Sequence, residues 1–308
     1  MKMNKFVKGF TAIALSTLVL AACGSDDKKD TAKSSESSTA TSKTAESSTE
    51  AEKVAGGDLQ DGTYKLEEKN ESNGYRATFE MTVKDGKITE SKYDNINADG
   101  KSKTEDKDYE KNMKDKTGVG PAEFIPELNE SFVKAQSASG VEVVTGATHS
   151  TESFQNYAQQ LIQAAQIGDT DTIEIDNGAP LKDGTYSLRE KNNSNGYHTT
   201  FSIVVKDGKV TESKYDNVND EGKSKTEDAE YNKSMKEKSG TNPETYIPAL
   251  NDEFVKAMNE EDGSAADVEV VTGATHSSHS FVIYAEQLIN AAEKGDTKEI
   301  VVDNIVTK

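Results

Sequence analysis

Apolar and polar residues follow two spacings after position 58, one of two residues and one of three to four. The first spacing predicts strands and the second predicts amphipathic helices. Together they predict an α+β unit with a largely antiparallel sheet and packed helices. The strands are expected at 61–64, 75–83, 88–96 and 172–175, with a tight hairpin turn at 84–87; the helices are expected within 103–116, at 121–136 and after 148.

The whole pattern occurs twice. Asp61-Gly62-Thr63-Tyr64 recurs 122 residues later, and the offset grows to 127 by Thr148 and Thr275. Five residues are therefore added in the second copy, in the polar stretch 259–267, which predicts a surface loop. Each copy has the length of an independent domain. The sequence thus predicts tandem repeats at 58–178 and 179–308.

One short stretch within each repeat is a candidate functional motif. The apolar run 141–144 predicts a strand, Thr145-Gly146-Ala147-Thr148 predicts a turn, and a long helix follows; 268–275 repeats this order. A small-residue turn that leads into a helix N-terminus suits a phosphate, because free N–H groups and the helix dipole favour negative charge. The alternative is that the hydroxyl residues only cap the helix.

The N-terminus has the pattern of an export signal. Lysines precede an uncharged, mostly apolar stretch at 9–19, which is too short to span a membrane. Leu20-Ala21-Ala22-Cys23 then ends at the chain's single cysteine and resembles a bacterial lipobox. The resemblance implies removal of residues 1–22 and a lipid on the Cys23 thiol, which would anchor the protein to the extracytoplasmic face of the cell membrane. The alternative is an ordinary signal peptide with an incidental cysteine.

Residues 23–57 are expected to be a disordered tether. From Gly24 onward they are almost entirely Ser, Thr, Ala, Lys, Glu and Asp, and Val54 is the only large apolar residue. Such a composition cannot bury enough surface to offset the entropy of ordering.

Charge and residue inventory exclude several function classes. The net charge is −19 and no basic patch is evident, so nucleic acid binding is not expected. No nucleophile, base and orienting group can be assembled from motifs, so no catalytic residue is assigned. His276 and His279 have a spacing that can hold a metal, but no further ligand is evident, so no metal site is expected.

Val-Val-Thr-Gly-Ala-Thr between a strand and a helix resembles the Ser/Thr-Gly-Ala-Thr signature of FMN-binding domains, which occur in Na⁺-translocating NADH:quinone reductase and Rnf subunits. A lipobox, a tether and two such domains resemble the flavinylated lipoproteins of Gram-positive extracellular electron transfer, including the pheromone-encoding type. The resemblance implies two covalent FMN groups, esterified through phosphate to Thr148 and Thr275 by a separate FAD-dependent flavin transferase.

The resemblance also implies roles for the other motif residues. Gly146 and Gly273 would give the phosphate room, Ala147 and Ala274 would avoid crowding the flavin, and Thr145 and Thr272 would hydrogen-bond phosphate oxygens. Glu142 and Glu269 stand where the family commonly has Asp. The paired candidates for contact with the isoalloxazine, each also readable as core, are Tyr75 and Tyr197, Met113 and Met235, and Phe124 and Tyr246.

The function implied is that of a redox relay rather than a stand-alone enzyme. The electron donor would be a membrane dehydrogenase acting through quinone, and the acceptor would be ferric iron or soluble flavin. The rival reading is a non-redox lipoprotein that binds a solute or the cell wall. In addition, the signal-peptide segment 15–22 resembles peptides released as pheromones.

Overall fold

A computed structural model describes residues 53–261 and 263–307. The signal peptide, Cys23 and nearly all of the predicted tether lie outside the described residues. Within those residues, no helix is both long enough and apolar enough to cross a membrane.

Each repeat builds one four-stranded sheet, which confirms the α+β prediction of two tandem repeats. The strand order is β4-β3-β2-β5 in the first repeat and β8-β7-β6-β9 in the second. Neighbouring strands are antiparallel except for the edge pairs β2–β5 and β6–β9, which are parallel. The elements of the first repeat are β2 (Gly62–Glu68), β3 (Arg76–Lys84), β4 (Lys87–Ile96), η1 (Lys103–Glu105), α1 (Lys107–Thr117), α2 (Pro121–Ala135), α3 (Thr148–Ile167) and β5 (Ile173–Ile175).

The second repeat has the same elements and one extra short helix, η3. They are β6 (Gly184–Glu190), β7 (His198–Lys206), β8 (Lys209–Val218), η2 (Lys225–Glu227), α4 (Ala229–Ser239), α5 (Pro243–Ala257), η3 (Ala265–Asp267), α6 (Thr275–Lys294) and β9 (Ile300–Val302).

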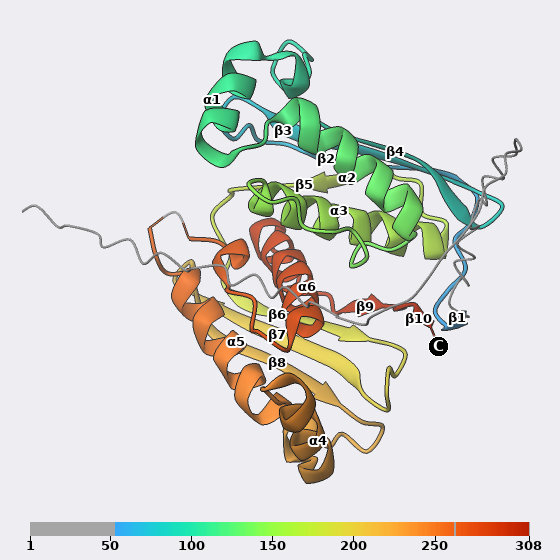
Figure 1. The fold of residues 1–308 in the computed structure, drawn as a ribbon, viewed down its shortest axis with the longest axis vertical. Coiled ribbons are helices and arrows are strands. Elements are labelled where there is room, and N and C mark those ends of the chain that lie inside the picture. Colours follow the sequence, from blue (N-terminus) through green and yellow to red (C-terminus); the bar gives the residue numbers. More distant parts are fainter. Residues whose placement is uncertain (1–52, 262, 308) are drawn as a thin grey trace, which may run out of the picture. The chain divides into compact units, whose positions relative to one another are not determined.

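The core of each repeat lies between the sheet and its two longer helices (Figure 1). Every second residue of β3 is buried, as the period of two predicts. Phe79 of β3 meets Phe132 of α2 and Phe154 of α3 with ring centroids 5.9 and 4.8 Å apart. Phe201, Phe254 and Phe281 repeat this cluster in the second core. These rings fix both helices to one face of the sheet.

A side-chain amide ties α2 to the sheet edge. Asn129 accepts hydrogen bonds from the Tyr93 backbone N–H (2.7 Å) and the Ser91 hydroxyl (2.6 Å), and donates to the Tyr93 carbonyl (2.9 Å). Asn251 makes the equivalent bonds to β8. Each amide thus serves backbone groups that face away from the neighbouring strand.

The predicted motif strands at 141–144 and 268–271 are wrong. Neither segment forms a strand or joins a sheet. Val141 and Val144 are buried, as a β-branched run suggests, but the Val144 N–H donates to the Thr151 hydroxyl (3.2 Å) and the Val141 carbonyl accepts from the Gln155 amide (2.7 Å). Side chains of α3 therefore replace the partner strand, which a period of two cannot reveal.

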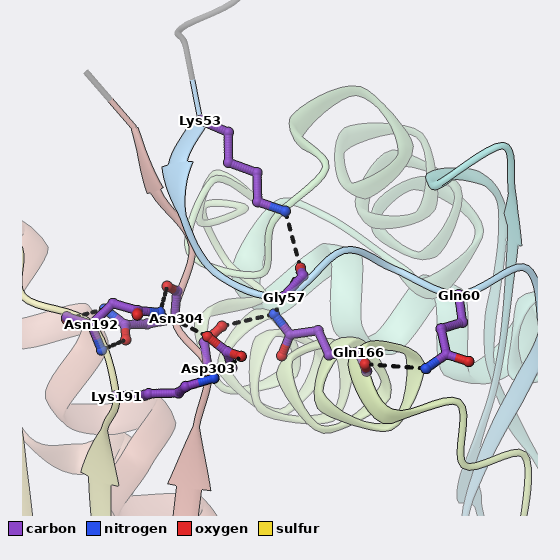
Figure 2. Close-up of polar contacts among 8 residues, drawn as sticks. All are labelled: Lys53, Gly57, Gln60, Gln166, Lys191, Asn192, Asp303 and Asn304. Atoms are coloured by element: carbon purple, nitrogen blue, oxygen red, sulfur yellow. Dashed lines mark hydrogen bonds and ion pairs between the residues drawn. The ribbon is translucent and has the colours of Figure 1, made fainter.

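The boundary of the predicted tether at residue 57 is also too late. β1 (Lys53–Ala55) pairs with β10 (Val306–Thr307), near the end of the chain. Nearby, the Gln166 amide donates to the Asp303 carbonyl (2.7 Å), and the Lys53 ammonium donates to the Gly57 carbonyl (3.0 Å) (Figure 2). Polar composition hid this short strand because backbone pairing, rather than apolar burial, holds it.

The two long helices α3 and α6 pack against each other through amides. Asn156 donates to the Asn290 side chain (3.0 Å), and Gln163 donates to the Gln287 side chain (3.2 Å).

The stretch with the five added residues is not a plain surface loop. It contains η3, Ala265 is 3% exposed, and η3 packs against α3.

We predict that Asn129→Ala lowers the free energy of unfolding by about 1–3 kcal/mol, because the Tyr93 N–H and carbonyl lose their partner. Glu130→Ala, an exposed neighbour on the same helix, is the control and should change it by less than about 0.5 kcal/mol. Denaturant titration of both variants checks this. Equal stabilities would contradict the role given to Asn129.

Candidate functional site

The motif threonines stand at helix ends that have no side-chain cap. α3 begins at Thr148 after the N-cap residue Ala147, and α6 begins at Thr275 after Ala274. Neither N-cap makes a side-chain hydrogen bond, so the alternative that the motif hydroxyls are ordinary helix caps is wrong. Thr148 and Thr275 are exposed, and each stands at the first position of its helix, where the first N–H groups have no partner within the helix.

A buried hydroxyl one turn into each helix holds the motif turn. Thr151 is 0% exposed; its hydroxyl accepts from the Val144 N–H and donates to the Ala147 carbonyl (3.0 Å). Ser278 makes the same two bonds, to Val271 and Ala274. The turn is therefore fixed from beneath, which leaves its outer side open.

The motif glycines are required by packing. Gly146 has φ 86°, and a Cβ there would lie 2.3 Å from the Thr117 carbonyl oxygen at the end of α1. At Gly273 the corresponding atom is the Ser239 carbonyl oxygen, 2.2 Å away. Glycine thus lets the turn close onto the preceding helix, a reason separate from room for a phosphate.

The remaining predicted motif residues lie on both sides of the turn. Ala147 and Ala274 are buried beneath it, whereas Thr145, Thr272, Glu142 and Glu269 are exposed. Glu142 and Thr148 line a common cavity of about 330 Å³. Glu269 does not line the cavity that contains Thr275.

The motif of the second repeat forms one wall of a cavity of about 290 Å³, here called the motif pocket. Its walls carry aromatic rings, one cation and hydroxyl groups. The lining includes Tyr197, Tyr215, Lys225, Tyr231, Met235 and the segment 273–277.

The cation of the motif pocket is held between two rings. Lys225 is 9% exposed, and its ammonium lies 5.1 Å from the ring centroid of Tyr197 and 4.2 Å from that of Tyr231. Lys103 lies between Tyr75 and Tyr109 at 5.1 and 4.1 Å. A cation held in this way next to an uncapped helix end favours an anion.

The first ring of each pair is fixed by a carboxylate. The Tyr75 hydroxyl donates to Asp106 (2.6 Å), and the Tyr197 hydroxyl donates to Asp228 (2.7 Å). The bond to Asp106 raises the pKa of Tyr75 to about 12, so the phenol stays neutral. The carboxylates of Asp106 and Asp228 also cap α1 and α4, which links ring position to the fold.

Sequence reasoning missed the two lysines. The available signal was the segment 102–106, Ser-Lys-Thr-Glu-Asp, which recurs unchanged at 224–228. Of the paired flavin-contact candidates, Tyr197 and Met235 line the motif pocket. Phe124 and Tyr246 are 1% exposed and belong to the cores, and Met113 packs against the first core.

Among the described residues, no group of three or more His, Cys, Asp or Glu side chains is placed to hold a metal ion. The exposed hydroxyl, the uncapped helix N-terminus, the clamped lysine and the aromatic walls instead fit a group that combines a phosphate with a planar ring system.

Comparison with known proteins points to the same ligand. A family model described as "FMN-binding domain" matches residues 74–163 and 196–290, together more than half of the chain. The 15 kDa lipoprotein of Treponema pallidum is 32% identical over 116 residues, which are 37% of this chain and 82% of that protein.

Among solved structures, the CPE2226 protein from Clostridium perfringens is 39% identical and covers 38% of this chain and 97% of its own, with a TM-score of 0.37. A solution structure from Clostridium thermocellum is 22% identical and covers 35% and 92%, with a TM-score of 0.24.

We predict that Gly146→Ala destabilises the protein more than Gly118→Ala. Both glycines have positive φ, so each substitution carries about 1–2 kcal/mol of backbone strain. Only Gly146 also meets a carbonyl oxygen, since a Cβ at Gly118 has nothing within 4 Å, and that overlap should add about 1–3 kcal/mol. Urea unfolding of the two variants checks the difference; equal losses would contradict the packing role.

Proposed function

This chain belongs to the FMN-binding domain family, and from that premise we propose that it is a lipid-anchored, extracytoplasmic electron carrier with FMN esterified to Thr148 and to Thr275. The observation that carries the proposal is the motif pocket, where the exposed Thr275 hydroxyl stands at an uncapped helix end beside Lys225 and two tyrosine rings.

Attachment uses the hydroxyl as a phosphate acceptor. The Thr148 or Thr275 oxygen attacks the FMN-side phosphorus of FAD, the bond between the two phosphates breaks, AMP leaves, and the hydroxyl proton passes to a base on the separate flavin transferase. An exposed threonine at the first position of a helix is accessible to such an enzyme.

The chain's own groups then hold the ester. Free N–H groups at the start of the helix, together with the Thr145 or Thr272 hydroxyl, would donate hydrogen bonds to the phosphate oxygens. The clamped lysine supplies a nearby positive charge, and the tyrosine rings offer flat apolar faces and exclude water from one side of the pocket. When bound, FMN supplies the reversible uptake of two electrons and two protons.

The proposed relay places this carrier between a membrane quinone pool and an external acceptor. A quinol formed by a membrane dehydrogenase gives up two electrons and two protons, and two ferric ions, or one soluble flavin, take the electrons. The Treponema relative is named a lipoprotein, and this chain has a lipobox at Cys23, so we extend the lipid anchor to it.

We predict that Thr148→Ala and Thr275→Ala each halve the flavin that remains on the denatured protein, because each removes one acceptor hydroxyl. Thr148→Ser should keep the full amount, because it retains an acceptor hydroxyl at the same position. The measurement is the flavin absorbance of the denatured protein, after the protein has been expressed together with the flavin transferase. Full flavin in the double alanine variant would refute attachment at these residues.

We predict that Lys225→Met reduces flavin loading at Thr275 several-fold while leaving loading at Thr148 unchanged. The exposed Lys223→Met, two residues earlier, is the control and should load normally. Mass spectrometry of the two motif peptides reads both sites in one sample, so the Thr148 peptide reports on folding. Normal flavin loading of Thr275 in the Lys225→Met variant would show that Lys225 has no role in flavin attachment at this site.

A further inference from the structure

The two long helices differ at several equivalent positions, and three of these differences change a titratable side chain that lines a cavity. With the offset of 127, Glu152 of α3 corresponds to His279 of α6, and the glutamines of α3 at 159 and 166 correspond to glutamates of α6 at 286 and 293. The motifs themselves are identical from Val143 to Ser150 and from Val270 to Ser277. The differences are therefore in the surroundings of the motifs.

Each long helix lines a cavity that belongs to the other repeat. A cavity of about 630 Å³ joins Glu68, Ser72 and Ser153 of the first repeat to Glu286 and Glu293 of α6; we call it cavity 1.

A cavity of about 260 Å³, here cavity 2, joins Glu190, Ser194 and Ser280 of the second repeat to Gln159 and Gln166 of α3. The first three of these residues also line the motif pocket around Thr275. Cavity 2 therefore adjoins the site at Thr275, and the equivalent residues place cavity 1 beside the site at Thr148.

At the third differing position, the carboxyl group of Glu152 is buried and lacks a full set of hydrogen bonds within the part of the chain that the structure describes. Glu152 is 5% exposed, and its Oε2 atom has no hydrogen-bond partner among the described residues. Glu152 lines, with Thr148 and His279, the cavity of about 330 Å³ described above. Burial, and then the charge of Asp267, raise its pKa to about 7. Burial and His276 instead lower the pKa of His279.

The pKa values of the other two carboxyl groups, those of Glu286 and Glu293, are also raised. Burial, and then the neighbouring Glu152, raise the pKa of Glu286 to about 8. Burial raises the pKa of Glu293 to about 7, although Glu293 accepts from the Gly178 N–H (2.7 Å). All three therefore exchange protons between about pH 7 and pH 8.

Glu71 also lines cavity 1 and has the neutral Asn193 as its equivalent, so it adds a negative charge on the side of Thr148. The other charged groups around the two cavities occur in equivalent pairs. Their effects on the two sites therefore largely cancel in a comparison. The pairs are Glu68 with Glu190, Asp176 with Asp303, and His149 with His276. Asp267, on η3, has no pair; it lies 3.8 Å from His149 and adds a further negative charge on the side of Thr148.

We propose that Glu152, Glu286 and Glu293 make the flavin site at Thr148 harder to reduce than the site at Thr275, so that electrons pass from the first repeat to the second. This inference rests on the proposed function. Negative charge opposes reduction, because added electrons raise the electron density of the site. At the second site the equivalent positions facing cavity 2, Gln159 and Gln166, are neutral and present no such charge.

The same groups set a pH dependence. Well above pH 8 all three carboxyls are ionised, and the reduction potentials of the two sites are furthest apart. As the pH falls below about 7 the carboxyls take up protons, and the gap narrows. The reduction potential of the site at Thr275, which lacks these groups, should keep the ordinary dependence of a flavin potential on pH.

Spectroelectrochemistry of the full chain tests the proposal. Thr275→Ala isolates the site at Thr148, and Thr148→Ala isolates the site at Thr275. At pH 9 we expect the reduction potential of the site at Thr148 to lie below that of the site at Thr275 by at least about 30 mV, which is a tenfold change in a two-electron equilibrium. At pH 5.5 the difference between the two potentials should be smaller. Equal potentials at pH 9 would overturn the proposal.

The triple change Glu152→Gln, Glu286→Gln and Glu293→Gln should raise the potential at Thr148 and leave that at Thr275 unchanged. The reciprocal pair Gln159→Glu and Gln166→Glu should lower the potential at Thr275 alone. Equal movement of both sites, or none, would overturn the proposal.

A second measurement needs no flavin. In the flavin-free protein, carbon NMR should show Glu286 titrating near pH 8, and titration in the usual range of a glutamate would overturn the proposal. If no flavin attaches to either threonine, the proposed function itself fails; flavin on both with equal potentials sinks only the present inference.

Discussion

The hydrogen bonds of one buried hydroxyl in each repeat determine what the motif can do. Thr151 holds the Val144 N–H and the Ala147 carbonyl, and Ser278 does the same in the second repeat. Because this hydroxyl lies inside the helix and beneath the turn, the turn needs no cap on its outer side. The exposed threonine that begins the helix is thereby left free for chemistry, and the first N–H groups remain available to a phosphate.

Duplication gives the molecule two such sites, and the packing of α3 against α6 exposes each to residues of the other repeat. Changes on one helix therefore act on the partner's site without altering its motif. The amide contacts between the helices keep this arrangement, since Asn156 and Gln163 meet Asn290 and Gln287 directly. Under the proposed function, this arrangement would let two sites with identical motifs differ in reduction potential.

Much of this could be predicted from the sequence. The period of two found β3 and its hairpin, and helical spacing found the buried face of α3, because both patterns report burial directly. The motif strand was wrong because a β-branched run reports extension but not its hydrogen-bond partner. β1 was missed because strand pairing at a chain end leaves no apolar signal. The clamped Lys225 was missed because its role depends on two rings that are near it only in the fold.

The central claim is that FMN is joined covalently to one threonine in each repeat. The most direct measurement is the mass of the motif peptides from protein purified from its own host, with fragmentation to place any added group. The account predicts the mass of an FMN phosphoester on Thr148 and on Thr275. Unmodified threonines in a host that has the flavin transferase would contradict it.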